Sequence, residues 1–419
     1  MRVLHVTPLY WPSIGGGEQV TQALAERLAR DGHAVTVLTT DASSVERFWS
    51  RRGPRVNPGE PEINGVRVVR VPARPFPVGQ LGLYLARGAA IRLFDPLRLS
   101  GVVRRIGAWM PRAPAFRTAL ARLAGQCDVI HGFNLSWESC LVDAYEIARA
   151  CRRKYLMTPF LHTGEPGQGR VSRNYTMSHQ LAALRGSDCV IVQTPTEARA
   201  IAALGVDETR LVEVGVGIDP AQIVGGDAVQ FRTRHNLRDP IIAFIGRVTR
   251  DKGATALVRA MQQVWVSGVE ADCVIAGLVL PDFDRYLKTH PVYPRLRVLG
   301  PISAADKRDL LASADVVAMP SRAESFGIVY LEAWAYGKPV IGARAGGAVD
   351  VISDGVDGYQ VPFDDASALA ARLLHLLSNP EHARSLGEAG RRKLFERYTW
   401  DTLYARSLDA YQSALREHG

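Results

Sequence analysis

Cysteine pairs, long apolar runs and a dinucleotide fingerprint are all missing from this chain of 419 residues. The five cysteines form no C-x-x-C pair, so their spacing indicates neither a zinc knuckle nor a disulfide framework. Cys127 and Cys273 lie at or near predicted strand starts, and we expect both in the core. Because no run of 18 apolar residues occurs, we expect nothing to span a membrane. The amino terminus enters a strand without a signal-peptide region, so we expect a cytoplasmic protein.

Lysine is absent from residues 1–125, and acidic residues are few there. This region holds 18 arginines against 8 acidic residues, a balance of +10, whereas the rest of the chain sums to −1. Between Leu81 and Trp109, leucine, isoleucine and valine interleave with arginine. Such a basic amphipathic stretch suits the inner face of an anionic membrane. It equally suits a helical pair packed on its own domain with a solvated basic face, and we expect no nucleic-acid partner.

Two carboxylates, Glu324 and Glu332, stand eight positions apart in the motif Glu-Ser-Phe-Gly-Ile-Val-Tyr-Leu-Glu. A predicted buried strand at 314–320 precedes the motif and a predicted helix at 329–336 overlaps its end. Glu324 therefore lies in a strand-to-helix loop, where ligands bind in parallel α/β sheets. Glu332 stands among apolar residues and needs donors, which ligand hydroxyls can supply. The plainer alternatives are a solvated loop charge for Glu324 and a structural arginine partner for Glu332.

A second strand-to-helix loop in the same region is cationic. Arg247 and Lys252 follow the predicted strand 240–246, and Gly253 opens a helix. Helix amino-terminal amides favour anions, and an arginine and a lysine beside them form a site for a phosphate or diphosphate. We expect both cationic side chains to be exposed. A solvated basic loop is the alternative, but the acidic loop nearby favours a site.

The alternation of strands and helices predicts two doubly wound, Rossmann-like α/β domains. The first spans residues 1–210 and contains a basic insertion at 43–114, with a hairpin around Asn64-Gly65. The second spans 211–395, and a further helix is expected in 396–419. The second-domain strands are expected at 240–246, 272–277, 295–300, 314–320 and 339–342.

These motifs together resemble the retaining glycosyltransferases of family 4 (glycosyltransferase group 1), which have the GT-B fold. That fold implies that the two domains face a cleft and that the helix in 396–419 crosses back to the first domain. The matching positions follow the family's order, from Gly15-Gly16-Gly17-Glu18 through Gly246-Arg247, Lys252-Gly253 and Glu324 to Glu332, ending at Gly346-Gly347. Asp350 stands where the family commonly has glutamate. The three amino-terminal glycines allow a ligand close to the backbone and allow positive φ. The resemblance covers most of the chain outside residues 43–114.

The resemblance implies that the second domain holds a nucleotide-diphosphate sugar. Arg247 and Lys252 would bind the diphosphate and stabilise it as the leaving group. Helix-start amides would add donors, namely those of Ser325, Phe326 and Gly327. The acceptor domain is implied to be the first.

The remaining roles follow from the same resemblance. Glu324 would contact sugar hydroxyls and Glu332 the ribose. Gly16 and Gly17 would approach the phosphates from the first domain. His162, after a predicted strand, would lie near the donor sugar; His131 fits that position less well.

The implied enzyme is a retaining hexosyltransferase. It would move a sugar from a UDP- or GDP-linked donor to a hydroxyl of a lipid-linked, glycan or small acidic acceptor such as a sugar phosphate. A non-catalytic nucleotide-sugar-binding scaffold and a nucleotide-sugar epimerase of similar fold remain as alternatives. Asp282-Phe-Asp284 has the D-x-D form that holds metals in the other glycosyltransferase fold. We expect these aspartates to cap a helix instead, and we expect no metal or other cofactor to be required.

Overall fold

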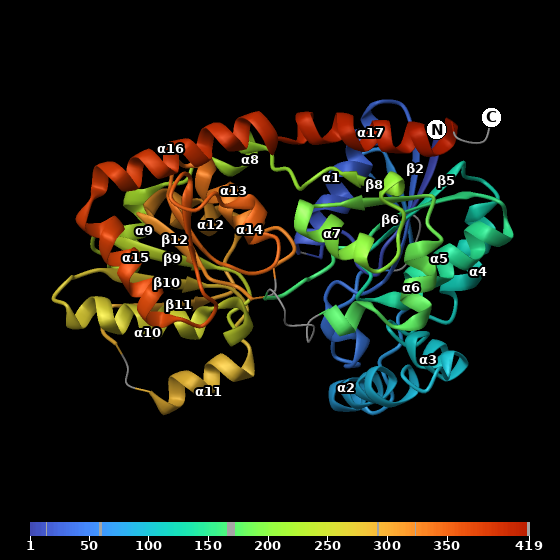
Figure 1. Ribbon diagram of the computed structural model, residues 1–419, viewed down its shortest axis with the longest axis horizontal. Helices are drawn as coiled ribbons and strands as arrows, with labels where there is room; N and C mark the ends of the chain where they lie inside the picture. Colours follow the sequence, from blue (N-terminus) through green and yellow to red (C-terminus); the bar gives the residue numbers. More distant parts are fainter. Residues whose placement is uncertain (14, 58–60, 166–171, 291–292, 323, 417–419) are drawn as a thin grey trace. The chain divides into compact units, whose positions relative to one another are not determined.

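The computed structural model describes residues 1–13, 15–57, 61–165, 172–290, 293–322 and 324–416. The chain forms two compact units (Figure 1). The first comprises Met1–Leu161, Arg170–Val214 and Tyr404–Gly419, and the second comprises His162–Gly169 and Gly215–Leu403. The main change of unit, at Val214, lies near the expected boundary at residue 210. The second unit also takes the segment with His162, which was expected in the first domain.

An eight-stranded sheet forms the centre of the first unit, in the order β3-β4-β2-β1-β5-β6-β7-β8. Only the β3–β4 pair is antiparallel among the described strands of this sheet. The strands are β1 (Arg2–Val6), β2 (Ala34–Thr40), β3 (Glu62–Ile63), β4 (Val66–Val71), β5 (Val129–Phe133), β6 (Lys154–Thr158), β7 (Cys189–Val192) and β8 (Leu211–Glu213). The helices are α1 (Gly16–Arg30), α2 (Gly79–Ala89), α3 (Ser100–Gly107), α4 (Phe116–Ala124), α5 (Glu138–Ala150), α6 (Ser178–Arg185) and α7 (Pro195–Ala203).

The second unit has a six-stranded, wholly parallel sheet in the order β11-β10-β9-β12-β13-β14. Its strands are β9 (Ile241–Ile245), β10 (Asp272–Ala276), β11 (Leu296–Gly300), β12 (Val316–Met319), β13 (Val340–Ala343) and β14 (Gly358–Val361). The helices are α8 (Pro220–Ile223), α9 (Ala228–His235), α10 (Ala254–Val266), α11 (Pro281–Thr289), α12 (Ala304–Ser313), α13 (Ile328–Ala335), α14 (Ala348–Val351), α15 (Ala366–Ser378), α16 (Pro380–Arg397) and the first turn of α17 (Trp400–Arg416).

This strand order places a topological switch point between β9 and β12. The chain moves outward from β9 through β10 to β11 and then returns to lay β12 on the other side of β9. Loops after the two central strands diverge there and leave a crevice at the carboxyl ends, which is where doubly wound sheets bind ligands. Both loops singled out in the sequence, after β9 and after β12, meet this criterion.

The strands form because their residues are continuous apolar runs, as parallel strands covered on both faces require. Every residue of β5, β9, β10 and β12 is buried. Cys127 and Cys273 are buried as predicted. All five expected second-domain strands are present. Two short strands, β8 and β14, had no counterpart among the expected strands.

The segment expected as a basic insertion contributes to the sheet itself. The predicted hairpin around Asn64-Gly65 is confirmed, because β3 pairs antiparallel with β4. However, β4 also pairs in parallel with β2, so it is a regular sheet strand. The part that departs from the sheet-and-helix alternation is α2, the short helical turn η2 (Ala90–Phe94) and α3.

The carboxyl-terminal helix α17 joins the first unit from Tyr404 onward. Tyr411 is fully buried, and its hydroxyl contacts His5 Nε2 at 2.8 Å and His131 Nδ1 at 2.5 Å. The second nitrogen of His131, Nε2, contacts Thr158 Oγ1 at 2.8 Å. His131 is therefore a buried hydrogen-bonding residue that links this helix to β5 and β6, while His5 links it to β1.

Within the described ranges, no helix is both long enough and apolar enough to cross a bilayer.

Candidate active site

Lys252 and Glu324 form the centre of the candidate site. Lys252 ends the turn η5 (Arg250–Lys252) after β9, and Glu324 lies in the loop between β12 and α13. The Lys252 Nζ donates to Glu324 Oε2 at 2.9 Å, and each side chain is only 13% exposed. The switch point thus brings together the basic and acidic residues that the sequence placed in separate loops.

Glycine makes this close approach of loops possible. Gly253, the residue directly before α10, has a φ of +87°. A Cβ atom there would lie 2.4 Å from the carbonyl oxygen of Pro320, the residue directly after β12. Any other residue would therefore separate the two loops, and with them Lys252 and Glu324.

The charge state of Glu324 follows from its surroundings. Burial raises its pKa, but the charge and hydrogen bond of Lys252 and the influence of His162 and Arg247 outweigh burial. The net pKa is lowered, so the carboxylate is ionised at neutral pH. An ionised, mostly buried carboxylate is suited to accept hydrogen bonds from ligand hydroxyls.

His162 shares this electrostatic environment. Burial, followed by the positive charges of Lys252 and Arg247, lowers its pKa to about 4, although Glu324 acts in the opposite direction. The imidazole is therefore neutral at pH 7. A neutral ring can donate and accept hydrogen bonds but brings no charge to the site.

Arg247 is exposed as expected, directly after β9 and the following Gly246. The expectation that Lys252 would be equally exposed is wrong, because its pairing with Glu324 draws it into the loop junction. Arg247 is thus the cation presented to solvent, whereas Lys252 is already partly compensated.

The loop that contains Gly346 and Gly347 packs against the loop that contains Glu324. Gly347 N donates to Glu324 O, and Gly346 N donates to Gly164 O, each at 2.8 Å. A Cβ at Gly346 would lie 2.1 Å from Glu324 O, and one at Gly347 would lie 2.0 Å from Ser325 O. These contacts join the Glu324 loop to the segment that carries His162. Asp350 lies nearby in sequence, in α14.

The residues after Glu324 lead into α13. Phe326 is buried against Tyr398, with ring centroids 5.4 Å apart, and Ser325 is partly exposed. Gly327 is the residue before the first turn of α13 and has a φ of +100°. A short helix therefore begins four residues after Glu324, at Ile328.

Glu332 has a protein partner. It is 3% exposed, and its Oε1 accepts from Lys307 Nζ of α12 at 2.5 Å. The structural partner considered from the sequence was an arginine; the structure provides a lysine. Lys307 was not among the predicted site residues, because it lies on a different helix with no motif around it.

Gly16 and Gly17 lie in the first unit, where α1 begins at Gly16 after Gly15. Gly15 has an extended φ of −170°, and neither Gly16 nor Gly17 has a positive φ. The expected use of positive φ is therefore wrong here. At Gly17 space is limited instead, because a Cβ there would lie 3.1 Å from the ring of Phe160, which would have to shift slightly.

Glu197 is a residue that the sequence analysis missed. It is buried in α7 and accepts from Leu161 N and Gln193 N, each at 2.6 Å. Burial raises its pKa to about 7 despite these two bonds. In the sequence, Thr194 and Glu197 look like an ordinary helix cap. No nearby residue indicates that the Glu197 carboxylate accepts from Leu161 N, directly before His162.

The two aspartates of the D-x-D pattern both have partners within the protein. Asp282 accepts from Thr249 Oγ1 at 2.6 Å and from Arg250 N at 2.8 Å, and Asp284 pairs with Lys288 at 2.6 Å. The expectation that they cap their helix is wrong, because Leu280 occupies that position without a side-chain cap. No cluster of metal-ligating side chains occurs in the part of the chain that the structure describes.

Two family models match this chain in succession. A "Glycosyl transferase 4-like domain" matches residues 15–217, and "Glycosyl transferases group 1" matches residues 227–393. The D-inositol 3-phosphate glycosyltransferase of Xylanimonas cellulosilytica is 30% identical over 99% of this chain and 96% of its own. The glycogen synthase of Mycobacterium tuberculosis is 27% identical over 99% of this chain and 95% of its own.

Solved structures agree on the fold. Anabaena HepE in complex with UDP and glucose superimposes with a TM-score of 0.74 at 18% identity, covering 99% of this chain and 100% of its own. Sucrose-phosphate synthase from Thermosynechococcus elongatus gives 0.69 at 21% identity, covering 99% of both chains. The predicted architecture of two doubly wound GT-B domains is therefore confirmed. With both halves matched in order and a relative aligned along nearly its whole length, this chain belongs to the group 1 glycosyltransferases and is a glycosyltransferase enzyme.

Proposed function

We propose that the chain moves a hexose from a nucleotide-diphosphate sugar, UDP- or GDP-linked, to an acceptor hydroxyl with retained anomeric configuration. The observation that carries the proposal is the junction of Arg247, Lys252, Glu324 and His162 at the switch point of the second unit. This junction combines two cations for a diphosphate with a carboxylate and a neutral imidazole for hydroxyl groups.

The diphosphate would displace part of the Lys252–Glu324 pairing. Arg247 and Lys252 would then neutralise the leaving group as the bond from the anomeric carbon to phosphate oxygen breaks. Amides at the start of α13, those of Ser325, Phe326 and Gly327, would add donors.

Glu324, released from part of its pairing, would accept from sugar hydroxyls. His162, whose imidazole is neutral at pH 7, would form a hydrogen bond with the sugar without adding a positive charge that repels Arg247 and Lys252. The acceptor oxygen bonds to the anomeric carbon and its proton passes to the departing phosphate, so no protein nucleophile is required. Glu332, held by Lys307, is proposed for the ribose, and Gly16 and Gly17 for the phosphates.

The acceptor classes are a lipid-linked molecule, a glycan and a small acidic molecule such as a sugar phosphate. The names of the relatives support the latter two, since one is an inositol-phosphate glycosyltransferase and another a glycogen synthase. The arginine excess of residues 1–125 suits either a sugar phosphate or a peripheral position at the inner face of an anionic membrane. We propose cytoplasmic action without a metal or other cofactor.

A thermal-shift panel of UDP- and GDP-linked hexoses tests donor binding, with UDP included because HepE was solved with it. The preferred donor is then incubated with inositol phosphate, glucan and polyprenyl phosphate, and the product's anomeric configuration is read by NMR. We expect a shift with one nucleotide series and a product of retained configuration. Donor binding without product from any acceptor would favour the scaffold, and a new nucleotide sugar without acceptor would favour the epimerase. An inverted product would refute retention.

A further inference from the structure

Helix α2 exposes most of its large apolar side chains, the reverse of what is usual for a helix packed on a soluble domain. Leu83 is buried, and Arg87 points inward to the buried carboxylate of Glu138, at 2.8 Å. The opposite face carries large apolar side chains that are 59–71% exposed: Val78, Leu81, Tyr84 and Leu85. A helix whose inner face holds an ion pair and whose outer face is apolar has its hydrophobic stripe directed at solvent.

The exposed apolar side chains continue along the chain into α3. Nine of the sixteen large apolar side chains exposed in the described ranges lie between residues 78 and 109, the further ones being Leu93, Leu97, Leu99, Val102 and Trp109. Scattered exposed leucines are ordinary, but this concentration in one short segment is not. We call this set, with the four of α2, the apolar face.

Charge identifies what can cover this face. Residues 73–127 contain nine arginines and a single acidic residue, Asp95, whose Oδ1 accepts from Ser178 N at 2.9 Å. Arg92, Arg98 and Arg105 are exposed within the segment. A second copy of the chain would bring like charges together, which disfavours a self-association interface. An anionic lipid surface satisfies both the apolar side chains and the arginines.

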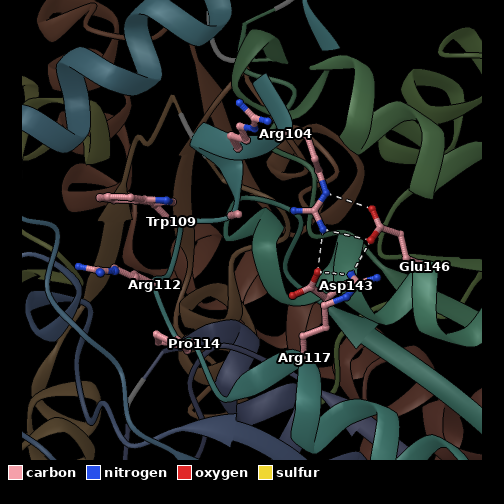
Figure 2. A pocket seen from close by; sticks show the side chains of 10 residues that line it. Arg104, Trp109, Arg112, Pro114, Arg117, Asp143 and Glu146 are labelled. Atoms are coloured by element: carbon pink, nitrogen blue, oxygen red, sulfur yellow. Dashed lines mark hydrogen bonds and ion pairs between the residues drawn. The ribbon is translucent and has the colours of Figure 1, made fainter. Parts of the chain in front are cut away.

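A pocket of about 560 Å³ borders the apolar face at Trp109 (Figure 2). On one side, Arg104 and Arg117 are both paired with Asp143 and Glu146, at 2.5–3.0 Å. The pairing cancels these four charges, and Arg105 and Arg112 leave the lining net positive.

Trp109 and Arg112 lie on the other side, with the guanidinium of Arg112 4.8 Å from the centroid of the Trp109 ring (Figure 2). A tryptophan beside an arginine is suited to the boundary between acyl chains and phosphates, since its ring is amphipathic and the guanidinium binds phosphate. The pocket therefore continues the apolar face with a place for a phosphate-bearing group.

We propose that the apolar face and this pocket together dock on an anionic phospholipid surface. The side chains of α2 enter the interface, and Arg105 and Arg112 meet lipid phosphates at the pocket. This assigns residues to the peripheral association named above and is independent of the donor site. Because apolar side chains penetrate, part of the binding withstands salt; a purely electrostatic attachment would not.

Sedimentation with phosphatidylglycerol-containing and pure phosphatidylcholine vesicles, at low and high salt, tests the assignment. The wild-type chain should bind the anionic vesicles at low salt and retain part of that binding at high salt. The double variant Leu81→Ser/Leu85→Ser should lose the salt-resistant part, with about a tenfold or larger drop in partitioning. The double variant Arg105→Gln/Arg112→Gln should bind weakly at low salt and lose the preference for anionic lipid.

Matched controls remove similar side chains elsewhere. Val266→Ser deletes an apolar side chain that is 88% exposed in the second unit, and Arg30→Gln deletes an exposed arginine of α1. Neither should change vesicle binding. All variants should keep the thermal shift with the nucleotide sugar, so a failure of docking is distinguishable from a failure of the donor site.

Three results would overturn the proposal. The first is indifference of the wild-type chain to anionic vesicles at low salt. The second is unchanged vesicle binding by the leucine variant. The third is a dimer in lipid-free solution that the leucine variant abolishes, which would assign the apolar face to a second copy.

Discussion

At the scale of single residues, Arg247 and Lys252 differ more than their shared positive charge indicates. Arg247 is exposed, whereas Lys252 holds Glu324 in a mostly buried pair. Arg247→Ala should lower kcat/KM strongly and leave the free energy of unfolding nearly unchanged. Lys252→Ala should lower both, with a stability loss of roughly 1–3 kcal/mol, because it leaves a mostly buried carboxylate without its cation.

Donor-dependent turnover and urea unfolding measure these two effects separately. Lys252→Arg, which keeps the charge, serves as the control and should recover most of the stability. Wild-type kcat in both alanine variants would remove the two residues from the proposed mechanism.

The glycine loop behind Glu324 gives a second residue-scale prediction. Gly347 has an ordinary φ of −70°, so Gly347→Ala acts only through its Cβ, which would lie 2.0 Å from Ser325 O. The Glu324 loop must then move, and we expect a large loss of turnover and roughly 1–3 kcal/mol of destabilisation. Gly101→Ala, in a helix with no atom near the added Cβ, should instead be neutral or stabilising by up to about 1 kcal/mol. Equal turnover in the two variants would show that the loop's position is unimportant.

At the scale of elements, the buried histidines under α17 make its attachment sensitive to acid. Burial lowers the pKa of His5 to about 3, and burial together with the charge of His5 lowers the pKa of His131 well below its usual value. Both are neutral when folded and take up protons when unfolded below about pH 6.5. Their contribution to stability is therefore complete above pH 6.5 and is lost as the pH falls towards 3.

Replacing one histidine tests whether these residues make the folded protein less stable as the pH falls. Between pH 4 and pH 5.5, stability should rise with pH by about 1.4 kcal/mol per unit more in the wild type than in His5→Asn. Denaturant unfolding at several pH values measures the two slopes. Glu197, whose pKa is also shifted, contributes equally to the slopes of both proteins and cancels in their difference. Parallel slopes would mean that His5 is protonated in the folded chain.

At the scale of the whole molecule, we predict turnover without a divalent metal. In the proposed mechanism, Arg247, Lys252 and the amides that precede α13 would oppose the leaving-group charge without a metal. Asp282 is occupied with Thr249 and the amide of Arg250, so Asp282→Ala should weaken donor binding by disturbing the basic loop. Activity should persist in EDTA in both proteins. Complete loss that added metal restores would reinstate the Asp282 and Asp284 pair as a metal site.

Several features of this protein follow from its sequence alone. The apolar runs of β9 and β12, the Asn64-Gly65 hairpin and the start of α10 after Gly253 depend on residues adjacent in the chain. Backbone sterics, turn chemistry and side-chain periodicity act over such short distances, so they are readable without coordinates. The loop positions of Arg247 and Glu324 follow for the same reason.

Other features were decided only by the tertiary structure. The ion pair of Lys252 and Glu324 joins residues 72 positions apart, and Tyr411 meets His5 across 406 positions. The support of the residue before His162 by Glu197, the pairing of Glu332 with Lys307, and the outward direction of the α2 leucines likewise depend on packing between elements. Periodicity shows that a helix has an apolar stripe, but only the neighbouring elements determine whether that stripe faces the core or the solvent.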